Sequence, residues 1–373
     1  MQMTHYPKGK SWDLSTVLGE AKTRREVLQE IYSDEEVKYY FETFPESLQE
    51  ELISFCMGNR GLKITYDPFF KYMFSPTMHP ERLSELLSLL FEDEVEVVEV
   101  LPNESPRITE SGSLLITDIV VRLRDGSYAN VEIQRIGYKF SGQRCASYSS
   151  DLLQRQLIRA KNTARKERRH FSYGDLKKVY TIVLIEESPA VYWQHPNVYI
   201  HRGRQKFDTG LEIDLLQEFI IIPLDIFRRI EHNEISKLEA WLYFIGSDSP
   251  RDIWRIVEAY PEFKELYNEM IGLRYDMKEL SNMFDSYRQI LREFDEGTVQ
   301  YMVEEQKKEL EEIEKRLQES REQLAESQEQ LQESQEQLQE SQEQLRETEK
   351  TLEEREKEIA CLRAKIKELE RDN

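Results

Sequence analysis

The sequence is poor in cysteine and contains no long hydrophobic run. Its three cysteines, Cys56, Cys145 and Cys361, are far apart and form no CxxC pair. We therefore expect no zinc site, and so few cysteines are typical of a reducing compartment. The longest apolar run, residues 219–224, falls far short of the ~18 residues that a membrane-spanning helix needs. The first residues also lack the apolar segment of a signal peptide, so we expect a soluble, cytoplasmic protein that does not contact a membrane.

Positive charge is scarce as well. The chain has 51 Lys and Arg against 72 Asp and Glu, which gives a net charge of −21. Residues 301–373 hold 23 of the acidic and 13 of the basic residues, which leaves residues 1–300 with a net charge of −11. A nucleic-acid-binding protein usually has a basic surface, so the overall charge argues against nucleic acid as a ligand. Only a local basic patch would reverse that conclusion.

The periodicity of apolar residues divides the chain into four segments. We expect a helical N-terminal extension at residues 1–60, a compact core at 61–245, a helical C-terminal part of that core at 246–300, and a coiled coil at 301–373. At the start of the core, Asp67 can cap a helix whose first position is Pro68. The next helix, after Pro80, has one apolar face formed by Leu83, Leu86, Leu87 and Leu90.

Strand-like alternation places a sheet in the middle of the core. We expect strands at residues 95–100, 114–123, 128–134, 179–185, 198–201 and 219–223. A helix over residues 142–166 is expected between the third and the fourth strand. The fourth strand is rich in β-branched residues, as is typical of a strand buried on both faces. Together these elements predict an α/β fold with a mixed sheet flanked by helices.

The C-terminal segment has the clearest periodicity. Aliphatic residues recur at every seventh position: Leu310, Leu317, Leu324, Leu331, Leu338, Leu345, Leu352, Ile359 and Ile366. Such a repeat predicts one long helix, from about residue 304 to 369, in a left-handed coiled coil. The second seam position is serine or threonine from Ser320 to Thr348, which buries little apolar surface and predicts a loose middle. We expect a homodimer; the alternative is a single exposed helix or a frayed, low-complexity tail.

The second and third expected strands predict a β-hairpin. Their apolar residues share one face of the sheet only if Ile119 lies opposite Val131 and Val121 lies opposite Ala129. A two-residue turn cannot give this register. We therefore expect an odd-numbered loop or a bulge at Gly126.

The same register places two carboxylates, Asp118 and Glu132, directly opposite each other. Such a pair destabilises a sheet unless a cation lies between the two side chains, and hard oxygen ligands suit Mg²⁺ or Mn²⁺. Gln134 lies on the same face, where it could hold a water, and the carbonyl oxygen of Ile133 could be a further ligand. The alternative is a solvated outer face, on which Asp and Glu are ordinary.

Several segments resemble, in order, motifs of the PD-(D/E)XK nuclease family transposases, also called recombination-promoting nucleases. They are TYDPFFKYMF, SLLITDIVVRLRDGSYANVEIQ, RCASYSSDLLQRQL, and FIIIPLDIF with WLYFIG, and they span about residues 64–244. The resemblance implies a restriction-endonuclease-like fold, DNA as substrate, and Asp118 and Glu132 as metal ligands. It places Gln134 where the wider superfamily usually has lysine. One departure is Ser149, because the family usually has a second tyrosine after the position of Tyr148.

The resemblance also assigns residues outside the hairpin. The first of these segments, TYDPFFKYMF, is the opening motif; it contributes Asp67 to the candidate catalytic residues and Lys71 to the candidate DNA contacts. The alternative is that Asp67 is a helix cap and Lys71 a surface lysine. The third segment, RCASYSSDLLQRQL, is the helix motif; it contributes Arg144 as a further DNA contact.

One dense basic run follows the helix motif. It consists of Arg159, Lys161, Arg165, Lys166, Arg168 and Arg169. Because this run is an exception in an acidic protein, we expect it to bind DNA phosphates. The alternative is a solvated helix end, where the helix dipole favours cations.

Two functions from different classes are compatible with these patterns. The first is a metal-dependent DNA endonuclease of a mobile-element or recombination-promoting type. In it, Asp118 and Glu132 hold Mg²⁺ or Mn²⁺, and Gln134 positions the attacking water. The second is a catalytically inactive nuclease fold that serves as a scaffold or binding module, oligomerised by its coiled coil. Metal binding and plasmid nicking would separate the two.

Overall fold

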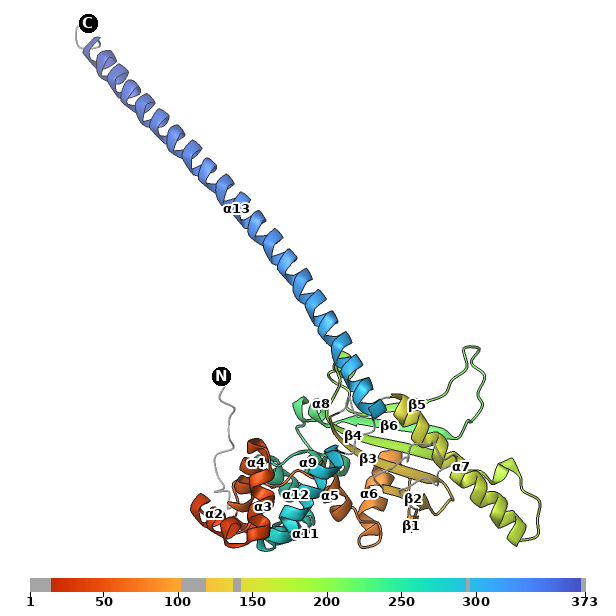
Figure 1. The fold of residues 1–373 in the computed structure, drawn as a ribbon. Helices are drawn as coiled ribbons and strands as arrows, with labels where there is room; N and C mark the ends of the chain where they lie inside the picture. The colour runs from red at the N-terminus through yellow and green to blue at the C-terminus, as the bar shows by residue number, and fades with distance from the viewer. Residues whose placement is uncertain (1–14, 102–118, 137–141, 293–295, 370–373) are drawn as a thin grey trace. The chain divides into compact units, whose positions relative to one another are not determined.

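The structure, a computed structural model, describes residues 15–101, 119–136, 142–292 and 296–369 (Figure 1). Contacts divide the chain into two compact units, Met1–Val303 and Glu304–Asn373. The first unit contains a mixed sheet flanked by helices, as the sequence predicted. No helix in the described ranges is long and apolar enough to cross a membrane.

Short amphipathic helices form the N-terminal part of the first unit. They are α1 (Ser15–Leu18), α2 (Arg24–Ser33), α3 (Glu35–Thr43) and α4 (Glu46–Cys56). Thr23 and Glu26 form a capping box at the start of α2, and the side chain of Asp34 caps α3. Their apolar sides are buried in the same core as the sheet. Within the described residues, the segment before residue 57 is therefore mainly helical.

Six strands form the sheet. They are β1 (Val97–Val100), β2 (Ile119–Leu123), β3 (Tyr128–Ile136), β4 (Val179–Glu187), β5 (His201–Arg204) and β6 (Gln217–Pro223). Their order in the sheet is β1-β2-β3-β4-β6-β5. The pairs β3–β4 and β4–β6 are parallel, and the other pairs are antiparallel. The central β4 is buried along nearly its whole length, as its β-branched composition predicted.

The edge strand β5 differs from the expectation. The sequence predicted a strand at residues 198–201, but pairing with β6 begins only at His201 and continues to Arg204. The β-prone Tyr199 and Ile200 pack, partly buried, against the core instead of pairing. The strand propensity of these two residues therefore reflects their burial rather than hydrogen-bonded pairing within the sheet.

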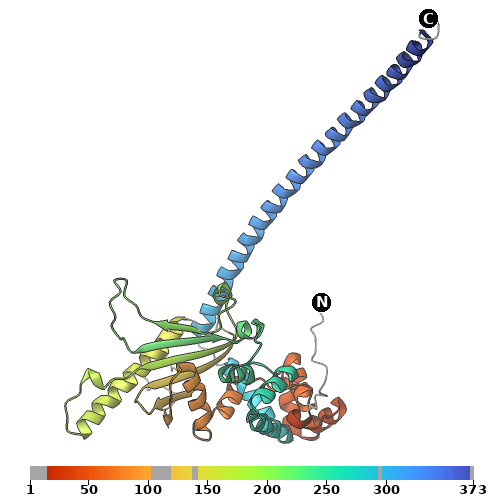
Figure 2. The same ribbon diagram turned by 180° about the vertical axis from the view of Figure 1, so that it is seen from behind.

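Helices cover both faces of the sheet. On one face lie α5 (Asp67–Met73) and α6 (Pro80–Phe91), whose leucines Leu83, Leu86, Leu87 and Leu90 are fully buried. On the other face lies α7 (Gly142–Lys166), which has the bounds that the sequence predicted. Figures 1 and 2, seen from opposite sides, show α6 and α7 separated by the sheet. The α7 crossover makes β3 and β4 parallel neighbours.

The start of α5 corrects one expectation. Asp67 is the first residue of the helix rather than its cap, because Tyr66 occupies the capping position and no side chain caps the end. The Asp67 carboxylate instead lies 2.9 Å from the ammonium of Lys71, one turn along. This pair matches the i, i+4 spacing of charges on a helix surface.

The hairpin of β2 and β3 has the predicted register. Ile119 pairs with Val131 and Val121 pairs with Ala129. The loop between Leu123 and Ser127 has three residues, and Gly126 has a φ of +92°. The odd-numbered loop with an irregular glycine is therefore confirmed.

The remaining helices complete the first unit and form the second. They are α8 (Leu224–Arg229), α9 (Lys237–Gly246), α10 (Pro250–Ala259), α11 (Phe263–Gly272) and α12 (Met277–Arg292), followed by α13 (Glu296–Leu369). Helices α9 to α12 confirm the helical pattern after residue 235. The single helix α13 has 74 residues, so the continuity of the tail is also confirmed. Its coiled-coil pairing is a separate matter, which one chain does not test.

Candidate active site on the α7 face of the sheet

The side chains of β3 alternate between two buried faces. Ala129, Val131 and Ile133 pack into the large core that contains α5 and α6. Asn130 and Glu132 lie on the α7 face and are also buried, with exposed fractions of 0% and 1%. The interpretation of a solvated outer face is therefore wrong for Glu132, because α7 covers it.

Asn130 is the polar neighbour of Glu132. Its side-chain Nδ2 donates a hydrogen bond to Glu132 Oε1 at 2.9 Å. The other amide atom, Asn130 Oδ1, and the hydroxyl of its strand neighbour Thr181 are buried without a hydrogen-bond partner among the described residues. Buried polar atoms are normally paired. The face of the sheet beneath α7 therefore has spare polar atoms beside a buried carboxylate.

The first turns of α7 lie over this polar region. Tyr148 and Cys145 are buried in a small cluster with Val183 of β4, which pairs with Glu132 in the sheet. Burial raises the pKa of the Cys145 thiol to about 12, and the nearby Glu132 charge acts in the same direction. Arg144 donates to the hydroxyl of Tyr148 at 2.7 and 2.9 Å. The helix motif therefore lies directly over β3, the strand that carries Glu132 and Gln134.

Gln134 lies at the more open end of the same face. It is partly buried and pairs with Ile185 of β4, as Glu132 pairs with Val183. Asp118 lies outside the described residues, so the predicted approach of its carboxylate to Glu132 stays a prediction. Within the described ranges no group of three His, Cys, Asp or Glu side chains could hold a metal ion. The oxygen donors that the site does supply, the Glu132 carboxylate and the Gln134 amide, are of the hard type that suits Mg²⁺ or Mn²⁺.

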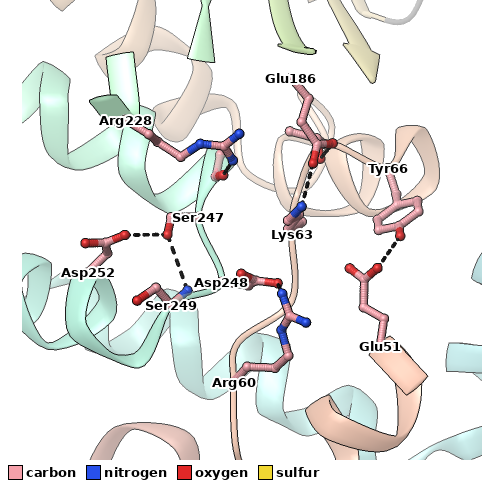
Figure 3. A network of polar contacts seen from close by, with 12 residues as sticks. Glu51, Arg60, Lys63, Tyr66, Glu186, Arg228, Ser247, Asp248, Ser249 and Asp252 are labelled. Carbon is pink, nitrogen blue, oxygen red and sulfur yellow. Dashed lines mark hydrogen bonds and ion pairs between the residues drawn. The ribbon is translucent and has the colours of Figure 1, made fainter. Parts of the chain in front are cut away.

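A second buried carboxylate, Glu186, lies on the opposite face at the end of β4. Lys63 Nζ lies 2.6 Å from one of its oxygens (Figure 3). Arg135 Nε lies 2.9 Å from the other oxygen, to which the Thr65 hydroxyl also donates a hydrogen bond. Burial disfavours the charge, but Arg135, Lys63 and Thr65 outweigh that effect, so the pKa of Glu186 lies below its usual value. This cluster joins the segment before α5 to the ends of β3 and β4.

Sequence reasoning missed the Glu186 cluster, although a signal was present. Ile182, Leu184 and Glu186 alternate on one face of β4, and the first two are core residues. A carboxylate that continues such a series must be paired. Its partners could not be named, because the bonds to Lys63 and Thr65 cross more than a hundred residues of sequence.

The opening motif lies next to the end of β3. The guanidinium of Arg135 stacks 4.0 Å from the ring centre of Tyr66. The Tyr66 hydroxyl donates to Glu51 at 2.6 Å (Figure 3). Tyr66 directly precedes Asp67, so the first turn of α5, with its Asp67–Lys71 pair, begins beside the residue that follows Gln134.

The basic run occupies the far end of α7, and part of it is neutralised. Arg159 pairs with Glu99 at 2.7 Å, Arg169 pairs with Asp175 at 2.6 Å, and Lys161 lies 5.6 Å from the ring centre of Phe171. The other members, Arg165, Lys166 and Arg168, are exposed. From Arg144 to Lys166 the helix advances 22 residues, or about 33 Å. The run is therefore not beside Glu132.

Comparison with known proteins identifies the family. A family model described as PD-(D/E)XK nuclease family transposase matches residues 64–292, more than half of the chain. No curated protein and no solved structure matches. The matched region contains α5 and α6, the six strands and helices α7 to α12. The chain therefore belongs to the PD-(D/E)XK nuclease family transposases.

Proposed function

We propose that this protein is a metal-dependent DNA endonuclease of a mobile-element or recombination-promoting type. The observation that carries the proposal is the burial of Glu132, at 1% exposure, in the middle of β3, within the region that the family model matches. A buried carboxylate on a strand is a hard oxygen donor held in a fixed position, and Mg²⁺ and Mn²⁺ prefer donors of this kind.

The proposed roles divide among the residues of the hairpin. Asp118, Glu132 and the carbonyl oxygen of Ile133 would hold Mg²⁺ or Mn²⁺. Asn130 orients the Glu132 carboxylate through its 2.9 Å hydrogen bond, and Gln134 positions the attacking water. A bound divalent metal would lower the pKa of that water and stabilise charge on the phosphate. These oxygen atoms fit the preference of both metals.

Residues around the hairpin would support binding and chemistry. We assign Asp67, at the start of α5, to the catalytic group because its helix begins beside the end of β3. Lys71 lies one turn along α5 from Asp67, and Arg144 lies in the first turn of α7, so we assign both to phosphates close to the cut. Arg159, Lys161, Arg165, Lys166, Arg168 and Arg169 would contact DNA further away.

We also propose that α13 pairs with α13 of a second copy. The seam residues from Leu310 to Ile359 are between 49% and 63% exposed in the single chain. Water-exposed aliphatic residues at seven-residue spacing are what a coiled-coil partner covers. A dimer would bring two sites to one DNA, and two sites can cut both strands.

The test is plasmid cleavage by wild-type protein and by Glu132→Gln. Removing the charge of a metal ligand should reduce Mg²⁺-dependent nicking by at least two orders of magnitude, and EDTA should abolish nicking by the wild type. Glu42→Gln, at an exposed position of α3, is the matched control and should cut normally. If the wild type neither cuts DNA nor binds Mg²⁺ or Mn²⁺ in calorimetry, the chain is the inactive scaffold instead.

A further inference from the structure

The far end of α7 carries an exposed patch that the cleavage site does not use. We call it the α7 tip: Arg165, Lys166 and Arg168, with Tyr173 of the following turn. The three cations form no ion pair within the described part of the chain, and Tyr173 is 75% exposed. The segment 159–169 has six basic residues and one acidic residue, in a body with a net charge of −11. Cations with an exposed aromatic ring are a surface suited to nucleic acid.

The backbone of the α7 tip gives an independent reason to look for a ligand. Arg168 ends the helix with a φ of +55°, in the left-handed region. Its neighbour Arg169 closes the helix end with an N–H bond of 3.0 Å to the carbonyl of Ala164. Glycine normally occupies this position, because other residues are strained there. Glycine would relieve the backbone at this position, so the Arg168 side chain is not required by the helix end itself.

The length of α7 determines the distance between the candidate site and the α7 tip. Cys145 packs in one cluster with Val183, the sheet partner of Glu132, so the start of α7 marks the site. Gln156 Nε2 donates to the carbonyl of Gly126 in the hairpin turn, and α7 continues beyond that turn. The ~33 Å from Arg144 to Lys166 is close to one turn of duplex DNA, about 34–36 Å.

We propose that the α7 tip is a second phosphate-binding point for duplex DNA, one helical turn from the cleavage site. This inference rests on the proposed endonuclease function and deepens it. A duplex is stiff over such a length, so its phosphates recur at a fixed distance, whereas a single strand has no such spacing. The substrate is therefore double-stranded DNA with an arm of at least about 10 base pairs on one side of the cut.

The first experiment measures binding, with full-length protein and no metal. Arg168→Gly should raise the melting temperature, because it relieves the backbone, and yet bind a 30-base-pair duplex several-fold more weakly. The slope of log K against log salt should become shallower by about 0.9, because the variant neutralises one phosphate fewer. Arg25→Ala, an exposed charge on α2, is the control and should change neither quantity. If Arg168→Gly is stabilised but binds duplex as the wild type does, the inference is overturned.

The second experiment measures cleavage of duplexes from 8 to 30 base pairs and of the matching single strands. Wild-type cleavage should rise sharply once an arm of about 10 base pairs is available, and Arg165→Ala with Lys166→Ala and Arg168→Gly should remove that rise. Equal cleavage of all lengths, or of single strands, would overturn the inference while the endonuclease proposal stands. Absence of any cleavage refutes the endonuclease proposal, and the binding experiment then still decides whether the tip holds duplex DNA.

Discussion

Glu132 and Glu186 are buried carboxylates on opposite faces of neighbouring strands, and their surroundings differ. Glu186 accepts from Lys63, Arg135 and Thr65, which together favour its charge. Glu132 accepts from the neutral amide of Asn130 and lies beside the Cys145 thiol. The ion pairs of Glu186 therefore hold the fold together. We assign Glu132 to metal because it lies on β3 opposite the predicted position of Asp118.

Replacing Glu186 by glutamine should destabilise the protein strongly. Lys63 and Arg135 would be left without their shared counter-charge, at a cost on the order of 3–5 kcal/mol. Because the folded-state pKa of Glu186 is lowered, this contribution is complete above the unfolded-state pKa of about 4.3 and disappears as the pH falls through the folded-state value. Urea unfolding of both proteins at several pH values measures the difference. If the difference in unfolding free energy between the two proteins is as large in acid as at neutral pH, the charge of Glu186 does not stabilise the fold.

Asp118→Ala should abolish Mg²⁺-dependent DNA cleavage and leave the fold intact. The register of the hairpin, confirmed as far as Ile119, motivates this prediction. Losing one carboxylate of the proposed pair removes the metal and with it the activated water. Nicking assays measure activity, and circular dichroism with a melting curve checks the fold. Cleavage at the wild-type rate would show that the site has been wrongly assigned.

At the residue level, the sequence predicted those features that follow from alternation. The faces of Glu132 and Val131 follow from a period of two, and the shared apolar face then determines the register. Alternation does not say what covers a face, so the burial of Glu132 under α7 was not foreseen. It also cannot name partners from distant segments, such as Lys63 for Glu186.

At the level of elements, long periodic segments were predicted best. Helix α7 has the predicted bounds because an amphipathic pattern of 25 residues leaves little freedom. The four-residue edge strand β5 was misplaced, because so short a segment carries almost no periodicity of its own. Asp67 was misplaced by one position for a similar reason, since a carboxylate before proline suits both the cap and the first turn.

The hairpin loop gives a prediction at this level. Gly126→Ala should destabilise the protein by about 1 kcal/mol or more, because the residue has a positive φ and a Cβ there would lie 3.3 Å from Lys177 Cγ. Denaturant unfolding measures the loss. The control is Gly142→Ala at the start of α7, where an added Cβ meets nothing within 4 Å. Equal stability of the two variants would show that the loop does not depend on glycine.

At the scale of the whole molecule, the expected dimer depends on the end of α13. The seam is weakest where serine alternates with leucine, so Ile359, Leu362, Ile366 and Leu369 should make the firmest contact. Full-length protein with Ile359→Glu and Leu362→Glu should therefore be monomeric at micromolar concentration, whereas the wild type should be dimeric. Light scattering measures both masses. A monomeric wild type would make α13 a spacer or a docking arm for a different protein.

Helix α13 also contains three consecutive SQEQL units, each seven residues from the next. A gain or loss of one whole seven-residue repeat keeps the aliphatic stripe continuous and changes the helix length by about 10 Å. A change of one residue would instead rotate everything after it by about 100°. The reach of this helix can thus change in steps of about 10 Å without loss of its aliphatic stripe.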